Sequence, residues 1–305
     1  MTAGTPVIEL REASKFFGHV VALERVSMSV RPGEVVCLLG DNGAGKSTLI
    51  KLLSGVFHPD EGSLWVDGSL ARFGSPRDAV AAGIATVYQD LALFPLMTIS
   101  RNFIVGTEPA RGRGMLAAIR FREADTLVRQ NLLEIGIEVR DTSDLVGTLS
   151  GGERQTLAIA RAEHIGARLL ILDEPTSALG VKEAAIVLRN VLRARAKGLA
   201  IVFITHNVHH AYAVGDRFLF LSRGRVLGVY DRDALTVDEM TRLMGGGAEL
   251  EDLTNELEQL RRQGESDGRG AAGNGGGGTD VAGGGGAVRG AMGTDAGGSA
   301  ARAQE

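Results

Sequence analysis

The sequence has one cysteine, no long apolar run and no cluster of basic residues, and each shortage excludes a class of protein. One thiol cannot form an internal disulfide, so Cys37, which lies in an apolar run, is expected to be a small core residue. No apolar stretch reaches the roughly 18 residues that a membrane-spanning helix needs. The net charge of −4 argues against a nucleic-acid-binding protein.

The first residues lack the basic and then apolar layout of a signal peptide, so we expect an intracellular protein that is soluble. Composition changes near Gly245, and residues 6–245 are long enough for one large α/β domain with its own core. Residues 264–305 contain 16 glycines and no Leu, Ile, Phe, Tyr or Trp, which predicts a disordered tail. Residues 246–263 space four leucines at helical intervals, predicting a short helix that docks on the domain or pairs with a partner helix.

Short apolar runs alternate with helical patterns along residues 6–245. This alternation predicts an α/β fold with a mostly parallel sheet. Residues 91–162 are poor in strand patterns and include a helical pattern at 121–134, which predicts a helical insertion. The strands are predicted at residues 7–11, 27–31, 35–39, 63–67, 83–89, 169–172, 200–205 and 218–221, and a further helix at 182–195.

The most informative motif is G-x-x-x-x-G-K-S/T at residues 40–48, directly after the apolar run 35–39. A strand that feeds a glycine loop and a helix forms an anion site, because backbone N–H groups and the helix dipole point into it. We expect Lys46 to reach the β- and γ-phosphates of a nucleoside triphosphate, and the Ser47 hydroxyl to bind Mg²⁺. The predicted phosphate-binding residues are Gly40, Asp41, Asn42, Gly43, Ala44, Gly45, Lys46, Ser47 and Thr48.

Two further motifs carry chemistry. Four apolar residues at 169–172 end in Asp173 and Glu174, which predicts two carboxylates at the edge of the sheet where ligands bind. Asp173 is expected to hold Mg²⁺, and Glu174 to polarise the attacking water. Ser150 precedes two glycines and a helical pattern that runs to Ala162, so it is predicted to cap a second helix N-terminus that faces an anion.

These motifs together resemble the nucleotide-binding subunit of ATP-binding cassette (ABC) transporters. Leu-Ser-Gly-Gly-Glu-Arg-Gln at 149–155 and Leu-Leu-Ile-Leu-Asp-Glu-Pro at 169–175 stand in that family's order, and the resemblance covers about residues 6–244. It implies a P-loop NTPase cassette with a RecA-like core, an antiparallel β subdomain and a helical subdomain at about 91–162. It also implies ATP and Mg²⁺ as cofactors, and a homodimer.

The resemblance assigns roles to residues that the motifs alone leave open. Phe17 matches the aromatic residue that stacks on adenine, and His206 the switch histidine on the γ-phosphate. Gln89 matches the glutamine that senses Mg²⁺ and the γ-phosphate and touches the membrane subunit. Ser150 and Gly152 match groups that contact the ATP of the opposing subunit.

One departure from the family pattern narrows the choice of subfamily within the ABC transporters. Gly180 stands where the family usually has aspartate, and residues 175–181 resemble monosaccharide importers, in particular the single-cassette type that resembles fructose importers. Such a subunit is expected to work with a polytopic membrane permease, and through it with an extracytoplasmic sugar-binding protein. Its expected location is the cytoplasmic face of the membrane, as a peripheral subunit. Apolar residues after Gln89 predict a permease-docking patch, formed by Leu91, Leu93, Phe94 and Pro95.

Two other classes of function compete with transport. A soluble cassette ATPase of DNA repair or translation usually has two cassettes or a long coiled-coil insertion, and basic surfaces. The sequence shows none of these features. A non-hydrolysing interaction module is disfavoured because Glu174 and His206 are both present.

Overall fold

The computed structural model describes residues 4–107, 110–111, 118–119, 125–126, 128–130, 132–133 and 141–244. The chain divides into two units, Met1–Glu251 and Asp252–Glu305, and every described residue belongs to the first. The predicted helix within 246–263 and the predicted tail at 264–305 lie outside the described residues, as does part of the predicted helix at 121–134. None of the helices in the described ranges has the length and apolarity needed to cross a membrane.

The central element is a six-stranded sheet in the order β12-β11-β3-β10-β9-β6. Strands β11, β3, β10, β9 and β6 are parallel, and β12 pairs antiparallel with β11 at one edge. The prediction of a mostly parallel sheet is therefore confirmed. Its strands are β3 (Val35–Leu39), β6 (Ile84–Val87), β9 (Leu169–Asp173), β10 (Ala200–Ile204), β11 (Arg217–Ser222) and β12 (Arg225–Asp231).

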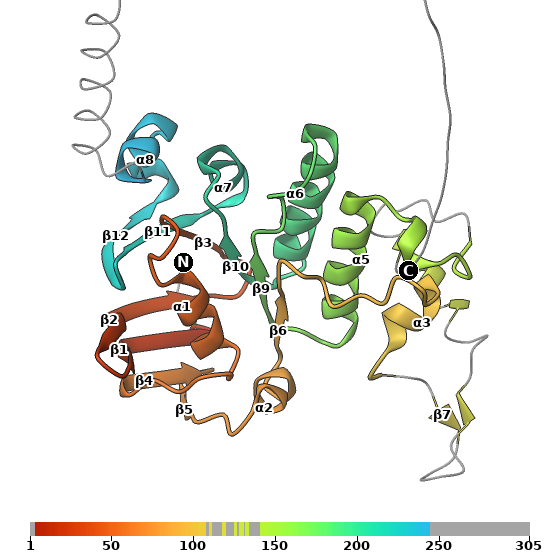
Figure 1. Cartoon of the computed structure of the whole chain (residues 1–305), viewed down its shortest axis with the longest axis horizontal. Coiled ribbons are helices and arrows are strands. Elements are labelled where there is room, and N and C mark those ends of the chain that lie inside the picture. The colour runs from red at the N-terminus through yellow and green to blue at the C-terminus, as the bar shows by residue number, and fades with distance from the viewer. Residues whose placement is uncertain are drawn as a thin grey trace, which may run out of the picture. The chain divides into compact units, whose positions relative to one another are not determined.

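The central strands β3, β9 and β10 are buried on both faces of this sheet, which explains why they are almost continuous apolar runs. Val36 and Leu38 of β3 contribute to one core, and Val35, Cys37 and Leu39 to the core on the opposite face. Cys37 is fully buried, as predicted. Four helices contribute to the second core, and Figure 1 shows three of them, α6, α7 and α8, above the sheet. The four are α5 (Gly151–His164), α6 (Val181–Ala196), α7 (Val208–Val214) and α8 (Val237–Met244), and a 3₁₀ turn, η3 (Arg232–Ala234), precedes α8.

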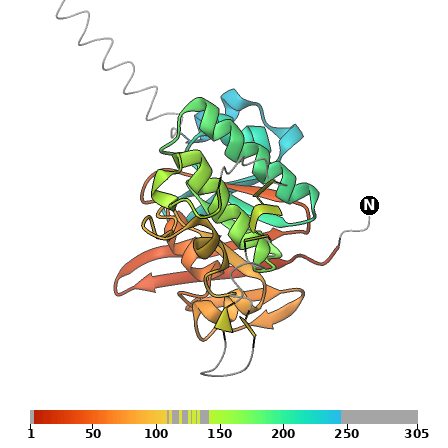
Figure 2. The same cartoon turned by 90° about the vertical axis from the view of Figure 1, so that its right-hand side faces the viewer.

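A second, antiparallel sheet in the order β2-β1-β4-β5 shares the first core with helix α1. The predicted turn at Asp67 and Gly68 closes the β4–β5 hairpin, with φ of 49° and 74°. Figure 2, turned from the first view, shows this sheet below the helices. These elements are β1 (Ile8–Phe17), β2 (Val20–Val30), α1 (Lys46–Leu53), β4 (Glu61–Val66), β5 (Ser69–Ala71) and α2 (Pro76–Ala81).

The predicted helical insertion has its own small core, in which Phe103 packs with Val128, Leu132 and Leu157. Leu157 lies in α5, and Ala158 and Ile159 of the same helix pack in the second core, so α5 joins the insertion to the rest of the domain. The insertion also contains a pair of two-residue strands that the sequence does not predict. Its elements are α3 (Ile99–Ile104), β7 (Ala110–Arg111), β8 (Ala118–Ile119) and η2 (Val146–Thr148).

Helices α5 and α6 are joined by a buried polar pair. The Asn190 side chain donates to Thr156 Oγ1 at 3.0 Å, and the Thr156 hydroxyl donates to the Gly152 carbonyl at 2.8 Å. Both side chains are fully or almost fully buried. A buried amide that loses its partner costs free energy because no water replaces it. The pair therefore fixes α5, which begins with the predicted Ser-Gly-Gly motif, against α6.

We expect Thr156→Val to lower the free energy of unfolding by about 1–3 kcal/mol, because it keeps the shape and removes the hydroxyl. The matched control is Thr241→Val in α8. Thr241 makes the same kind of bond, to the Val237 carbonyl at 2.8 Å, but it is exposed. That control should change the free energy by less than about 0.5 kcal/mol. Urea unfolding measures both variants, and equal losses would contradict the assigned role of the buried pair.

Candidate functional site

The predicted site residues meet because of the order of the strands. The carboxyl ends of β11, β3, β10, β9 and β6 lie side by side in that order along one edge of the sheet. A cleft of about 560 Å³ opens at this edge. It is lined by Val20, Val21, Ala22, Asp41, Asn42, Gly43, Gly45, Lys46, Ser47, Thr48, Gln89, Asp173, Glu174, Arg223 and Gly224. Ligands bind at such an edge in open α/β sheets.

The loop between β3 and α1 depends on glycine at two positions. Gly40 has φ of 151°, and a Cβ atom there would overlap the carbonyl oxygen of Leu221. Gly45 has φ of 105°, and its Cβ would lie 2.8 Å from the Ala22 carbonyl oxygen. Other residues would therefore push the loop away from the strands on both sides of it. The close fit shapes the loop whose backbone N–H groups precede the N-terminus of α1.

Lys46 is the first residue of α1, and its ammonium lies against the loop. Nζ donates to the Gly40 carbonyl at 2.6 Å and to the Asp41 carbonyl at 3.0 Å. Ser47 and Thr48 follow in the first turn of α1 and line the same cleft. The positive charge, the helix N-terminus and the hydroxyls therefore face one space, which is the chemistry that a polyphosphate requires.

Asp173 ends strand β9 at the floor of the cleft. Burial raises the pKa of its carboxyl group, the neighbouring Glu174 raises it further, and Lys46 lowers it. Burial disfavours the ionised form because water no longer solvates the charge. A divalent cation would supply the missing positive charge.

Glu174 follows in a left-handed backbone conformation, with φ of 49°. Its N–H donates to the Ile204 carbonyl at 3.0 Å, which brings the end of β9 to the end of β10. Its side chain is 14% exposed, and Oε1 is hydrogen-bonded to His206 Nδ1 at 2.9 Å. Oε2 is buried, and no described residue hydrogen-bonds to it. Because buried polar atoms usually have a hydrogen-bond partner, this oxygen leaves one acceptor unsatisfied at the edge of the cleft.

Six predicted residues do not line this cleft. Gly40 and Ala44 belong to the loop beside it, and His206 is bonded to Glu174, whereas the other three are Phe17, Ser150 and Gly152. Phe17, at the end of β1, is 43% exposed. Ser150 is exposed and caps α5, accepting from the Glu153 N–H at 3.3 Å, as predicted. Gly152 lies in the first turn of α5, close to Glu183 of α6, to which an added Cβ would approach within 3.0 Å. The structure therefore groups Lys46 with Glu174 and leaves the Ser-Gly-Gly motif apart from them.

Sequence reasoning missed one side of the cleft. Arg223 and Gly224 form the turn between β11 and β12, beside the phosphate loop. The Gly224 N–H donates to the Ala44 carbonyl at 2.8 Å, and the Gly224 carbonyl accepts from the Glu24 N–H at 2.8 Å. The sequence did contain a signal for Arg223, because this residue follows the predicted strand 218–221 and so lies at the carboxyl end of that strand. The strand order, which the sequence does not reveal, makes it a neighbour of the loop.

The permease-docking patch expected after Gln89 differs from the prediction. Phe94 is exposed by 52%, but Leu91 and Leu93 are partly buried and pack against two of the hydrophobic cores. Leu96, which the prediction did not include, is exposed by 89%. The exposed apolar pair is therefore Phe94 and Leu96, with the exposed Pro95 between them.

The family model of ABC transporters matches residues 23–177. The chain is 42% identical over 238 residues to the xylose/arabinose import ATP-binding protein XylG of Sulfolobus acidocaldarius, covering 78% of this chain and 93% of that protein. It is 41% identical over 253 residues to the fructose import ATP-binding protein FrcA of Rhizobium meliloti, covering 81% and 96%. It is 37% identical over 251 residues to the ribose import ATP-binding protein RbsA 2 of Escherichia coli O157:H7, covering 82% and 48%.

Solved structures agree on the fold. A nucleotide-free ATP-binding cassette from an ABC transporter aligns with a TM-score of 0.65 and 22% identity, over 78% of this chain and 94% of that one. A dimeric ATP-binding cassette in a post-hydrolysis state, bound to ADP and Pi, aligns with a TM-score of 0.62 and 26% identity, over 74% and 98%. The predicted α/β cassette fold is confirmed.

The raised pKa of Asp173 gives a pH-dependent prediction. The folded state holds the proton more tightly than the unfolded chain, so ionising Asp173 lowers stability above its ordinary pKa of 3.8. We expect Asp173→Asn to increase the free energy of unfolding without nucleotide at about pH 7.5, and the gain to shrink toward about pH 4.

Asp60→Asn is the matched control of opposite sign. Hydrogen bonds from the Lys15 side chain and the Phe16 N–H lower the pKa of Asp60, so the ionised form stabilises the fold. This variant should lose stability near neutral pH. Urea unfolding at several pH values measures both variants. A loss of stability in Asp173→Asn near neutral pH would contradict the electrostatic cost assigned to Asp173.

Proposed function

This chain belongs to the ABC transporter family, and we propose that it is the ATP-hydrolysing subunit of an importer that takes up a monosaccharide through separate permease subunits. The observation that carries this proposal is the single cleft in which Lys46, Asp173 and Glu174 meet, with His206 bonded to Glu174. The sugar is inferred from the xylose/arabinose, fructose and ribose importers to which the chain is similar.

In this proposal the loop from Gly40 to Thr48 binds the phosphates of ATP through its backbone N–H groups. Lys46 would exchange its bonds to the Gly40 and Asp41 carbonyls for the β- and γ-phosphate oxygens. Phe17, half-exposed at the end of β1, would stack on adenine. Arg223 adds a second cation to the lining of the cleft.

The residues present fit a magnesium ion. Among the described residues, no cluster of three or more His, Cys, Asp or Glu could hold a metal by itself. Mg²⁺ in phosphate sites usually takes one or two carboxylates and completes its shell with phosphate oxygens and water. Ser47, Gln89 and Asp173, all lining the cleft, would hold it. When bound, the ion would neutralise charge that develops on the phosphates.

Glu174 would act as the general base. Its carboxylate would accept a hydrogen bond from the attacking water, and the bond between Oε1 and His206 would orient it. His206 is more exposed than Glu174 and can also donate to a γ-phosphate above it. The left-handed backbone at Glu174 turns the side chain away from the strand direction. Gln89, at the end of β6, would help to sense the γ-phosphate.

A second copy of the chain would complete each site. Ser150 and Gly152 stand at a helix N-terminus outside the cleft, so they would contact ATP held by the partner in a homodimer. A dimeric cassette is among the solved structures that this chain resembles. Gly180 caps α6 with its N–H 3.4 Å from Glu183 Oε2, and would take the place of the usual aspartate at the dimer interface.

Permease coupling is proposed at Phe94 and Leu96. The buried Asn102 side chain accepts from the Phe94 N–H at 2.9 Å and donates to the carbonyls of Phe94, Met97 and Thr98. These bonds hold the segment rigid while its apolar side chains remain exposed. The subunit would therefore sit peripherally at the cytoplasmic face, and act through the permease with an extracytoplasmic sugar-binding protein.

The domain boundaries also remain proposals. Residues 6–245 would form the cassette, with the helical subdomain at about 91–162. Helix α5, which contributes to the core of that subdomain, runs two residues further, to His164. The predictions for residues 246–263 and 264–305 concern residues outside the described ranges.

Glu174→Gln tests the hydrolytic site. It should reduce ATP turnover by about 10²–10⁴-fold, because the amide that replaces the carboxylate cannot act as a base. ATP binding should remain intact. With ATP, this variant should also accumulate as a dimer in light scattering. Lys46→Ala is the contrasting variant, since it removes a charge aimed at the phosphates and should weaken binding itself. Wild-type turnover in Glu174→Gln would show that Glu174 is not the base.

Phe94→Asp tests the coupling surface. A charge in the exposed apolar pair should leave the ATPase rate of the isolated subunit nearly unchanged and abolish the stimulation of ATPase by sugar in the reconstituted transporter. Leu70→Asp is the matched control, since Leu70 is exposed to nearly the same extent, 51%, on strand β5. If both variants transport sugar at the wild-type rate, the docking assignment is wrong.

A further inference from the structure

Two aromatic rings meet beside the first strand of the antiparallel sheet. The centroids of Phe17 and Phe57 lie 5.3 Å apart with an interplanar angle of 66°, an edge-to-face contact. Phe17 is the last residue of β1, and Phe57 follows helix α1. The Phe57 N–H donates to the Lys51 carbonyl in α1 at 2.9 Å. The second ring is therefore attached to the helix whose N-terminus faces the phosphate cleft.

An ion pair between Lys15 and Asp60 fastens the same segment to β1. Asp60 accepts from Lys15 Nζ at 2.9 Å and from the Phe16 N–H at 2.7 Å, and its own N–H donates to the Ser14 carbonyl at 2.9 Å. The Lys15 side chain is largely buried, and its Nζ lies 5.7 Å from the Phe17 centroid and 5.9 Å from that of Phe57. One ammonium thus contacts both rings, where cation–π attraction adds to the ring contact.

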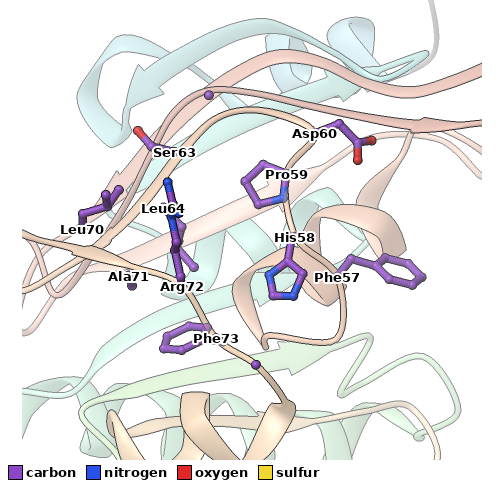
Figure 3. A pocket seen from close by; sticks show the side chains of 12 residues that line it. Phe57, His58, Pro59, Asp60, Ser63, Leu64, Leu70, Ala71, Arg72 and Phe73 are labelled. Atoms are coloured by element: carbon purple, nitrogen blue, oxygen red, sulfur yellow. The ribbon is translucent and has the colours of Figure 1, made fainter.

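The segment from Phe57 to Asp60 also forms a wall of a second cleft, of about 600 Å³. Figure 3 shows the His58 ring pointing in a different direction from the Phe57 ring. Arg72 and Phe73 line the cleft opposite this wall. His58 therefore shares the segment with Phe57 without sharing its aromatic contact. A substitution of His58 therefore alters the same segment and leaves the pair of rings formed by Phe17 and Phe57 in place.

We propose that Phe57 is a positioning residue for the base of the bound nucleotide. The inference rests on the proposed function, in which Phe17 stacks on adenine. A half-exposed ring at the end of a strand has several orientations, and only one presents its face to the base. The Phe57 ring and the Lys15 ammonium hold Phe17 in one orientation, so less conformational freedom is lost when the nucleotide binds.

The test compares ATP with tripolyphosphate, which fills the phosphate site and has no base. In Mg²⁺-free buffer, where hydrolysis does not interfere, Phe57→Ala should weaken ATP binding by about two- to tenfold, the range of an aromatic pair. The affinity for tripolyphosphate should stay at the wild-type value. In steady-state assays, KM for ATP should rise and kcat should be unchanged. Phe57→Tyr, which keeps the ring, should bind ATP as the wild type does.

Three further variants separate a positioning role from a structural one. His58→Ala on the same segment should leave both affinities unchanged. Phe17→Ala should weaken ATP binding, and adding Phe57→Ala to it should cause little further loss, because Phe57 acts through Phe17. Calorimetric titration measures the affinities, and thermal unfolding confirms that each variant is folded.

The outcomes distinguish this inference from the proposed function. If Phe17→Ala binds ATP normally, the base platform of the proposed function is wrong. If Phe17→Ala weakens ATP binding but Phe57→Ala and His58→Ala have the same affinity for ATP, only the role of Phe57 is overturned. Equal losses for ATP and tripolyphosphate in Phe57→Ala would also overturn it, because the effect would then reach the phosphate site. The role of Phe57 would also be overturned if the losses of ATP affinity from Phe17→Ala and Phe57→Ala were additive in the double variant.

Discussion

The burial of strand β3 on both faces is the constraint on which the site depends. Its five residues lie between β11 and β10 in the sheet and between the two hydrophobic cores on its faces. The loop that follows therefore begins at a fixed position, the strand's carboxyl end. There Gly40 passes so close to Leu221 that no side chain fits. The loop at residues 40–48 is therefore positioned by a fully buried strand, and the groups on β9 and β10 are placed relative to it by backbone pairing.

In the proposed function, the cleft receives a bound cation beside two neighbouring carboxylates. Asp173 and Glu174 stand together at the end of a buried strand, and the burial that raises the pKa of Asp173 works against the stability of the empty domain. The left-handed backbone at Glu174 and its unpartnered oxygen are further local costs. In the proposed function, each of these costs would be offset when a cation and a polyphosphate bind.

Local patterns were sufficient to predict much of this site. The loop at 40–48, the carboxylates after β9 and the cap at Ser150 each follow from a few consecutive residues, because strand, turn and helix signals coincide there. Features set by strand order or packing could not be predicted in this way. Arg223 joins the cleft because β11 neighbours β3, and Leu93 turns inward because a small core forms around Phe103. No consecutive residues encode either relation.

The two backbone bonds of Gly224 have a consequence for nucleotide length. Through them the phosphate loop is tied to β2, and β2 pairs with β1, which ends at Phe17. Phe17 and the loop at residues 40–48 are thus parts of one hydrogen-bonded frame. In the proposed function, this frame would fix the separation between the ring that stacks on the base and the ammonium group of Lys46. A ligand with a base would then contact both groups only when its phosphate chain is long enough to reach Lys46.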